Sequence, residues 1–470
     1  MIKSKLNKYR YFDPDPIIRE IAYELYSKNK DLPIVCPHGH VDPGLFTEDK
    51  PFSNPTELIL IPDHYVFRLM YSQGVKLESL GIPTIDGTEI ETDPRKIWQI
   101  FGDHFYLYAG TPTGQWLNHE FKMVFDIDIE LNSDTAMEFY DGLNNKLQQP
   151  EYFPRVLYDR FNIEVLNTTD AATDLLEDHQ QIKDSGWNAR IIPCFRPDNL
   201  LDIGLPDWKI NIDLLSQVSG IEVNSYSTFI SALENRREFF KGMGAVSTDH
   251  AVVMPLTEEL TTATAEAIFQ RALMGRADAD DESRFMAHML MEMARMSIED
   301  GLVMQLHAGS FRNHNQFIFN RFGRDKGDDI PVKNEFTRNL RALLNRYGNN
   351  PDLTLIVFTL DEANYARELA PLAGHYPAMK LGPAWWFHDS INGMTRFREM
   401  VTETASIYNT VGFNDDTRAF PSIPARHDLS RRVDSNFLAR MVASHQLSLS
   451  DAHRMAKALA YDLVKSTYKL

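Results

Sequence analysis

The sequence has little cysteine, no long apolar run and no excess of positive charge. Its 470 residues include two cysteines, too few for a disulfide framework, so we expect a protein of the reducing cytoplasm. The N-terminus lacks the apolar core of a signal peptide, and no apolar run approaches the roughly 18 residues of a membrane helix. A formal net charge of −18 argues against nucleic acid as a partner, because phosphates are neutralised by Lys and Arg.

Short apolar runs recur along the chain, each ending in polar residues, with segments of helical composition between most of them. Alternating strands and helices imply parallel pairing, and strands buried on both faces are nearly continuously apolar. We count eight such units, which predict a closed (β/α)8 TIM-type barrel; an open doubly wound sheet is the alternative. The eight runs span residues 33–37, 163–166, 190–194, 244–247, 302–306, 353–358, 378–381 and 408–413.

Uneven spacing between these runs divides the chain into four parts. Residues 1–40 hold the N-terminal segment and the first strand, and residues 41–160, rich in aromatics, predict a mainly helical insertion over the barrel mouth. Residues 161–425 contain the rest of the barrel with long βα insertions, and residues 426–470 predict C-terminal helices. The expected α/β fold is therefore a distorted barrel with a large insertion after its first strand.

Two histidines, His38 and His40, follow the first predicted strand directly. Residues i and i+2 of a strand point to the same side, so both imidazoles can face one metal ion. Such a pair is a weak signal alone, because two histidines are more often surface or packing residues. Their place at the end of an apolar strand, followed by Asp42 and Pro43, favours metal binding.

Acidic residues follow the last predicted strand, at Asp415 and Asp416. In a closed barrel the last strand lies beside the first, which brings an acid next to His38 and His40. Two imidazoles and a carboxylate suit a divalent metal such as zinc, with positions left for water or substrate. Alternatively, the two acids cap the helix that follows. Arg418 is suited to bidentate binding of another carboxylate.

The remaining strand ends are also polar, and barrel active sites are assembled from C-terminal strand ends. Any one of these residues is more often structural than catalytic, but several on one rim predict a site. From the insertion, Asp63, His64, Tyr65 and Arg68 can close over that rim, although an amphipathic helix with a buried aromatic stripe explains the same pattern. The strand-end residues are Arg196, Asp249, His250, His307, Asp361, Glu362, Trp385, Trp386 and Phe387.

Taken jointly, these residues resemble the uronate isomerases, a divergent branch of the metal-dependent amidohydrolase superfamily. The resemblance covers most of the chain and is carried by DLPIVCPHGHVDP, PDHYVFRLMYSQG, MQLHAGSFRNHN, GPAWWF and NDDTRAFPSIPARHD. It implies one divalent metal ion, usually zinc, bound by His38, His40 and Asp416. Hydrolytic members often use a lysine after the fourth strand and a histidine after the sixth, and both are missing here. We therefore expect no binuclear site.

The resemblance implies an aldose–ketose isomerase that converts D-glucuronate to D-fructuronate and D-galacturonate to D-tagaturonate, by ring opening and C2-to-C1 proton transfer. Its expected partner is this small substrate, and a homo-oligomer is plausible for a barrel of this size. The alternatives are a mononuclear metal-dependent hydrolase of the same superfamily and a non-catalytic sugar-acid-binding protein. The expected catalytic residues are Asp416, Tyr65, His307 and Asp249, and the expected substrate contacts are Arg196, Arg418, His64 and Trp386.

Overall fold

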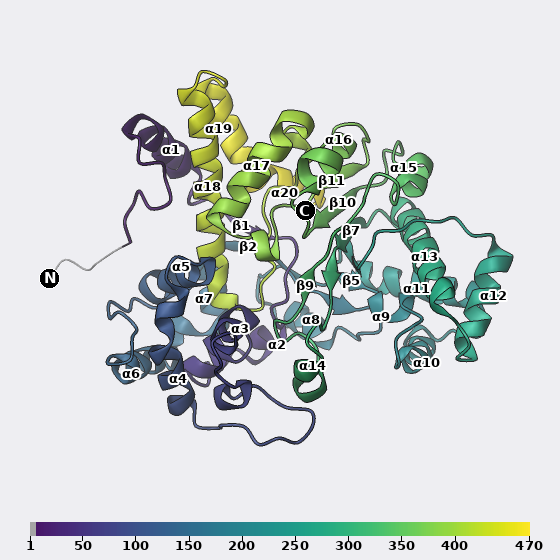
Figure 1. Ribbon diagram of the computed structural model, residues 1–470, viewed down its shortest axis with the longest axis horizontal. Coiled ribbons are helices and arrows are strands. Elements are labelled where there is room, and N and C mark those ends of the chain that lie inside the picture. The colour runs from purple at the N-terminus through teal and green to yellow at the C-terminus, as the bar shows by residue number, and fades with distance from the viewer. Residues whose placement is uncertain (1–5) are drawn as a thin grey trace.

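Two parallel sheets form the barrel in the computed structural model, which describes residues 6–470 (Figure 1). One sheet has the order β1-β2-β4 and the other β11-β10-β7-β6-β5-β3. Because β3 continues β2 and β5 continues β4, the sheets are joined along these strands. The strands are β1 (Ile34–Cys36), β2 (Ile163–Asn167), β3 (Asp170–Ala171), β4 (Ile191–Ile192), β5 (Phe195–Arg196), β6 (Ser247–Val252), β7 (Val303–Ala308), β10 (Leu355–Thr359) and β11 (Met379–Leu381).

The segment after Thr410 closes the barrel. Leu381 in β11 forms a parallel bridge with Thr410, and the Leu381 carbonyl accepts a hydrogen bond from the Val411 N–H at 3.1 Å. On the other side of this segment, the N–H of His40 donates to the carbonyl of Thr417 at 2.9 Å. The first and last barrel segments therefore meet, which confirms the predicted (β/α)8 barrel and excludes the open sheet.

Two of the predicted strands are wrong in their extent. The fourth, expected at 244–247, is β6 at Ser247–Val252, because its residues are polar but buried against the barrel centre. Gly244, within the expected run, has a φ of 102° and belongs to the turn before this strand. The eighth, expected at 408–413, is only the bridge at Thr410, preceded by the 3-10 helix η8 (Ile407–Asn409).

Apolar side chains fill the barrel interior and close one of its ends. The C-terminal helix α20 (Leu463–Thr467) is followed by Tyr468, which is buried in this cluster and donates a hydrogen bond to Gln305 Oε1 at 2.8 Å. The candidate active site therefore lies at the opposite end, where the strands terminate in polar residues. The interior side chains include Val35, Val165, Ile192, Val303, Ile356 and Val411.

Helices joined by loops make up the connection between β1 and β2, and they form a cluster beside the barrel with its own apolar core around Trp98 and Phe139 (Figure 1). This confirms the predicted helical insertion. Helix α3 (His64–Tyr71) begins after Asp63, whose carboxylate accepts the Tyr65 N–H at 2.8 Å. The α-helices between the strands are α2 (Gly44–Glu48), α3 (His64–Tyr71), α4 (Pro94–Asp103), α5 (Pro112–His119), α6 (Ala136–Leu147) and α7 (Pro154–Arg160).

The other βα connections carry helices around the remaining sides of the barrel, and a short antiparallel pair, β8 (Ser310–Phe311) with β9 (Ile330–Pro331), follows β7. These helices are α8 (Glu177–Asp184), α9 (Asp198–Leu201), α10 (Trp208–Ser219), α11 (Tyr226–Gly242), α12 (Thr262–Leu273), α13 (Ala279–Asp300), α14 (Gln316–Phe322), α15 (Arg341–Tyr347), α16 (Ala370–Ala373) and α17 (Ile391–Ala405).

The long helix α18 (Ile423–Ala443) packs against α1 (Pro16–Asn29), α17 and α19 (Leu449–Lys457), so most of its length is buried (Figure 1). Its buried positions include charged side chains, which must find partners inside the protein. Within residues 6–470, no helix combines the length and the apolar character needed to cross a membrane.

Candidate active site

His38, His40 and Asp416 lie together at the polar end of the barrel. Asp416 Oδ1 is 3.4 Å from His38 Nε2 and 3.1 Å from His40 Nε2. Although it is buried, Asp416 Oδ1 has no hydrogen-bond partner. An unpaired carboxylate oxygen facing two imidazole nitrogens is an arrangement that a cation stabilises. Ligand atoms about 2.1 Å from a tetrahedral zinc ion lie about 3.4 Å apart, so these residues fit such an ion.

The charges around His38 also favour a cation. Burial opposes protonation of its ring, but the carboxylates of Asp249 and Asp416 outweigh burial and raise the pKa of His38 well above its usual value. His40 differs, because burial lowers its pKa despite the contact with Asp416. The negative potential at His38 thus stabilises positive charge, whether it is carried by a proton or by a metal ion.

His307 and Asp249 lie on the other side of His38. The His307 ring stacks on that of His38 with centroids 4.7 Å apart, and its Nδ1 is 2.5 Å from Asp249 Oδ1. Because a carboxylate only accepts, Nδ1 carries the proton and Nε2 keeps its lone pair. His307 Nε2 is buried and unpartnered. Arg196 joins the group through Asp249, with Nη1 3.2 Å from Oδ2.

Trp385 fixes the second oxygen of Asp416. Its indole N–H donates to Asp416 Oδ2, which leaves Oδ1 free to face the histidines. The Trp385 ring also contacts His307, with centroids 4.6 Å apart. The sequence analysis placed both tryptophans at a strand end and chose Trp386 as the substrate contact, so it missed the contact of Trp385 with Asp416.

Tyr65 and His64, at the start of α3, extend from the insertion toward the site. Tyr65 packs against the aromatic cluster of Trp385 and Trp386, and His64 lies 6.2 Å from the Trp386 ring between centroids. Burial keeps both groups neutral: it raises the pKa of Tyr65 well above its usual value and lowers the pKa of His64 to about 3. The rest of α3 buries Val66, Phe67 and Met70, so the helix is amphipathic, as the structural alternative expects.

Arg418 faces solvent-accessible space at the mouth. It lines a cavity of about 200 Å³ together with His40, and its side chain is 42% exposed. Its Nη2 donates to Asp325 Oδ2 at 3.1 Å, a partner that the sequence did not reveal. The cavity is lined by His40, Val41, Asp42, Pro43, Thr168, Thr169, Asp170 and Arg418.

Two residues of the site have strained backbones. Asp416 has a φ of 43° and Trp386 a φ of 53°, in the left-handed region that costs a bulky residue about 1–3 kcal/mol. Such conformations persist only where surrounding contacts enforce them. Neither acid after the last strand caps α18, whose N-cap position is Ser422. The capping alternative for Asp415 and Asp416 is therefore wrong.

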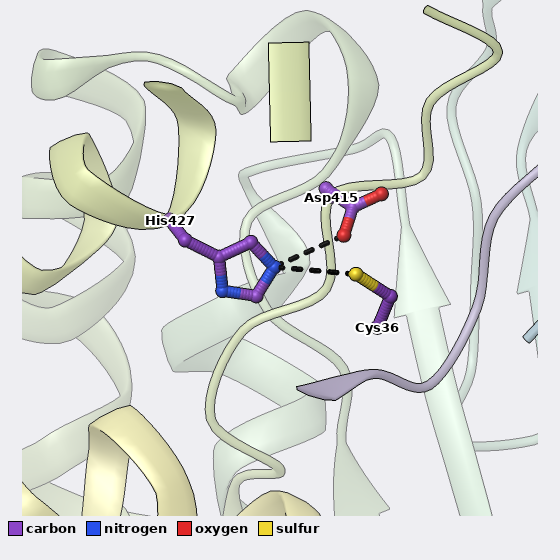
Figure 2. A group of neighbouring side chains, drawn as sticks. All are labelled: Cys36, Asp415 and His427. Atoms are coloured by element: carbon purple, nitrogen blue, oxygen red, sulfur yellow. Dashed lines mark hydrogen bonds and ion pairs between the residues drawn. The ribbon is translucent and has the colours of Figure 1, made fainter. Parts of the chain in front are cut away.

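A second group of metal-ligand side chains lies behind the first. Figure 2 shows Cys36, Asp415 and His427, with both dashed lines meeting at one ring nitrogen of His427. His427 Nε2 is 3.0 Å from Asp415 Oδ2 and 3.8 Å from Cys36 Sγ. Since the carboxylate only accepts, Nε2 carries a proton and has no lone pair for a metal. This group therefore reads as a hydrogen-bonded network.

Other expected residues serve the scaffold. His250 bonds to Thr248 Oγ1 at 3.0 Å, away from the metal-ligand group, and burial lowers its pKa to about 3. Asp361 Oδ2 accepts the N–H of Asn334 at 3.1 Å. The sequence reasoning missed Arg426, a fully buried arginine that donates to the Asp415 carbonyl at 2.8 Å. Its only signal was its place in the PARHD motif.

Comparison with known proteins identifies this arrangement. The family model described as glucuronate isomerase matches residues 16–468. The chain belongs to the glucuronate isomerase family. The uronate isomerase of Nostoc punctiforme is 54% identical over 469 residues, spanning 100% of this chain and 99% of that protein. The resemblance predicted from the sequence is confirmed.

Solved structures of the glucuronate isomerase family share the whole fold. The crystal structure of glucuronate isomerase from Caulobacter crescentus superposes with a TM-score of 0.97 at 49% identity, covering 99% of this chain and 97% of that one. That of a uronate isomerase from Thermotoga maritima superposes with a TM-score of 0.92 at 28% identity, covering 99% of both chains. The likeness therefore includes the insertion as well as the barrel.

Proposed function

We propose that this protein is an aldose–ketose isomerase that converts D-glucuronate to D-fructuronate and D-galacturonate to D-tagaturonate. The observation that carries the proposal is full-length membership of the glucuronate isomerase family, with a uronate isomerase 54% identical to the chain. A closed uronate must first open, which requires one group to accept the anomeric hydroxyl proton and another to protonate the ring oxygen. Isomerisation then moves a proton from C2 to C1 through an enediol.

We infer that His38, His40 and Asp416 hold one divalent metal ion, and that the ion is zinc. The unpaired Asp416 Oδ1 and its 3.1–3.4 Å separation from the two histidine nitrogens support this assignment. When bound, such an ion supplies Lewis acidity that polarises a substrate oxygen. Two imidazoles with a carboxylate are a common ligand set of catalytic zinc.

The proton transfers are assigned to Asp416 and Tyr65. Asp416 is the proposed general base: its carboxylate stays ionised because, despite the opposing effect of burial, the neighbouring histidines hold its pKa well below the usual value. Tyr65 is the proposed second proton-transfer or oxyanion group, since burial keeps its hydroxyl protonated. His64 and Trp386 are proposed to line the substrate on the insertion side.

The two arginines are proposed to hold the substrate, one of them at its C6 carboxylate. Arg418 is the better candidate for the carboxylate, because it lies at the open cavity with His40. Arg196 is already paired with Asp198 at 2.7 Å and with Asp249 at 3.2 Å, which suits it to orienting hydroxyls through fixed donors. Asp249 orients His307, whose free Nε2 is proposed to accept a substrate or metal-shell hydrogen bond.

Hydrogen exchange at C2 tests the proposal. D-Glucuronate and D-galacturonate are incubated with the protein in deuterated water and followed by NMR. We expect ketose formation with deuterium incorporation, because proton transfer through an enediol exposes the proton to solvent. Binding without exchange or turnover indicates a sugar-acid-binding protein, and hydrolysis of a lactone or amide panel indicates a hydrolase; either outcome overturns the proposal.

A cytoplasmic location and a homo-oligomeric assembly are proposed with this function. Both cysteines, Cys36 and Cys194, are buried free thiols, which is compatible with a reducing compartment. Fractionation of cells and light scattering of the purified protein test the two statements separately.

A further inference from the structure

Asp416 occupies a backbone conformation that it does not prefer. Its φ of 43° lies in the left-handed region, yet no glycine stands there, because the carboxylate is needed. Such a conformation persists where surrounding contacts enforce it. The residues on both sides of Asp416 are therefore the place to look for what enforces its geometry.

Both neighbours are fixed by hydrogen bonds. On one side, the Asp415 carboxylate is 3.0 Å from His427 Nε2, and the Asp415 carbonyl accepts from Arg426 Nη1 at 2.8 Å. On the other side, the Thr417 carbonyl accepts the His40 N–H at 2.9 Å. Consecutive residues thus face opposite ways: Asp415 toward α18, and Asp416 toward the histidine pair.

His427 and Arg426 are adjacent on α18 and are themselves rigidly placed. Both are buried, and the Arg426 guanidinium lies 3.8 Å from the centre of the Trp116 ring and 3.0 Å from Asp389 Oδ2. Neither side chain can follow a moving strand end, because packing fixes each one. Because these two side chains are fixed on α18, they hold Asp415, to which both are hydrogen-bonded, in a fixed position relative to the helix.

We propose that His427 and Arg426 are positioning residues that direct the Asp416 carboxylate toward the metal position. The inference rests on the proposed function, since it takes Asp416 as a ligand. Residues that orient a metal ligand from behind change metal affinity by about 10- to 100-fold when they are replaced. Loss of the His427 contact lets Asp415 turn, and Asp416 then relaxes away from the two histidines.

The test compares two substitutions of His427 by amide side chains of different length. In His427→Gln the side-chain N–H reaches about as far as the imidazole Nε2, whereas in His427→Asn it stops short of Asp415. The matched control is His288→Asn, which removes a buried helical histidine bonded to Tyr226 at 2.9 Å, outside the site. Folding of each variant is checked by circular dichroism and thermal unfolding.

The readouts are zinc affinity by chelator competition and the visible spectrum of the cobalt-substituted protein. We expect His427→Asn to bind zinc about 10- to 100-fold more weakly, with altered cobalt bands. His427→Gln and His288→Asn should stay near the wild-type protein. If His427→Asn does not fold, Asp415→Asn takes its place and should show a smaller loss of the same kind.

The outcomes separate this inference from the function on which it rests. Wild-type protein that binds one zinc ion, with His427→Asn giving the same affinity and the same cobalt spectrum, overturns the positioning role alone. Equal losses in His427→Asn and His288→Asn also overturn it, because they indicate general destabilisation. Wild-type protein that binds no stoichiometric metal overturns the metal assignment together with this inference, whereas the isomerase activity is tested separately by exchange at C2.

Discussion

Two groups of side chains with the same chemistry lie back to back at the closure of the barrel. In the group formed by His38, His40 and Asp416, the ligand atoms approach to 3.1–3.4 Å and Asp416 Oδ1 stays unpaired. In the group formed by Cys36, Asp415 and His427, one nitrogen bonds to the carboxylate at 3.0 Å. We call these the front group and the back group.

The difference shows that residue types alone do not make a metal site. Both groups combine an imidazole and a carboxylate within 4.8 Å, and the back group adds a thiol, a good zinc ligand. In the back group His427 Nε2 already carries the proton that it donates to Asp415 Oδ2, although Asp415 Oδ1 is buried without a partner, and burial raises the pKa of the Cys36 thiol well above its usual value. In the front group Asp416 Oδ1 lies unpaired beside two imidazole nitrogens, and His40 lines the cavity through which a ligand can reach them.

The largest expected effect follows from disabling the front group at Asp416. Asp416→Asn keeps the shape but loses the charge and the base, so we expect kcat for D-glucuronate to fall by about 10³-fold. Bound zinc should fall in parallel. Asp428→Asn, a half-buried carboxylate on α18 whose partners include Arg10, Arg432 and Tyr26, is the control and should lose stability rather than turnover. Near-normal turnover of Asp416→Asn would contradict the assignment of Asp416 as the general base, and the front group would then have no catalytic role that the back group lacks.

Next in size is the loss of carboxylate recognition at the front group's cavity. Arg418→Met should raise KM for D-glucuronate by about 10- to 100-fold, the worth of a charge-assisted pair. The uncharged parent sugar should be affected much less. Arg324→Met, which removes an exposed arginine 3.9 Å from Asp207, is the matched control. Equal losses for the acid and the neutral sugar would assign carboxylate binding to another residue.

The front group could be predicted because it depends on local sequence and on closure. An HxH pair after an apolar strand and an acid after the last one must meet once the barrel closes, as His38, His40 and Asp416 do. Strand extent was less predictable. In β6, polar side chains face the buried site, so the apolar pattern stops where the strand begins.

The back group and Arg426 could not be predicted, because the charged composition of their helix normally indicates exposure to solvent and not burial. A helix rich in Arg, His and Asp predicts a solvent-exposed surface, yet α18 buries Arg426, His427 and Arg432. The packing of α1, α17 and α19 against this helix makes it internal. Strand position alone left open which of Asp415 and Asp416 faces the histidines, since the choice depends on a left-handed residue, and only the resemblance to the family implied Asp416.

A third, smaller effect concerns a buried carboxylate that belongs to neither the front group nor the back group. Glu120, in the π-helix η4 (Glu120–Val124), has its pKa raised to about 8, chiefly by burial and also by Asp63. The folded protein therefore holds a proton that the unfolded chain releases near pH 4.5. The stability contributed by protonation is complete below that pH and is lost as the pH rises through about 8.

Glu120→Gln should remove this pH dependence. We expect wild-type and variant proteins to have similar melting temperatures at pH 5, and the variant to melt about 2–4 °C higher at pH 9. Glu138→Gln, at an exposed position on α6, should leave the pH profile unchanged. A constant difference between wild type and Glu120→Gln at all pH values would show that Glu120 does not titrate in this range.

The smallest expected effect is that of Cys36→Ala, which sharpens the comparison between the two groups when it is set beside His38→Ala. His38→Ala and Cys36→Ala alter residues two positions apart on the same strand end, one in each group. His38→Ala should lose the single bound zinc ion, whereas Cys36→Ala should retain it and lose only about 1 kcal/mol of stability. Metal analysis by mass spectrometry and urea unfolding measure the two quantities. The contrary outcome is two zinc ions in the wild type, with one lost in Cys36→Ala. It would mean that His427 Nε2 loses its proton and binds a metal ion, so that the back group is a metal site as well.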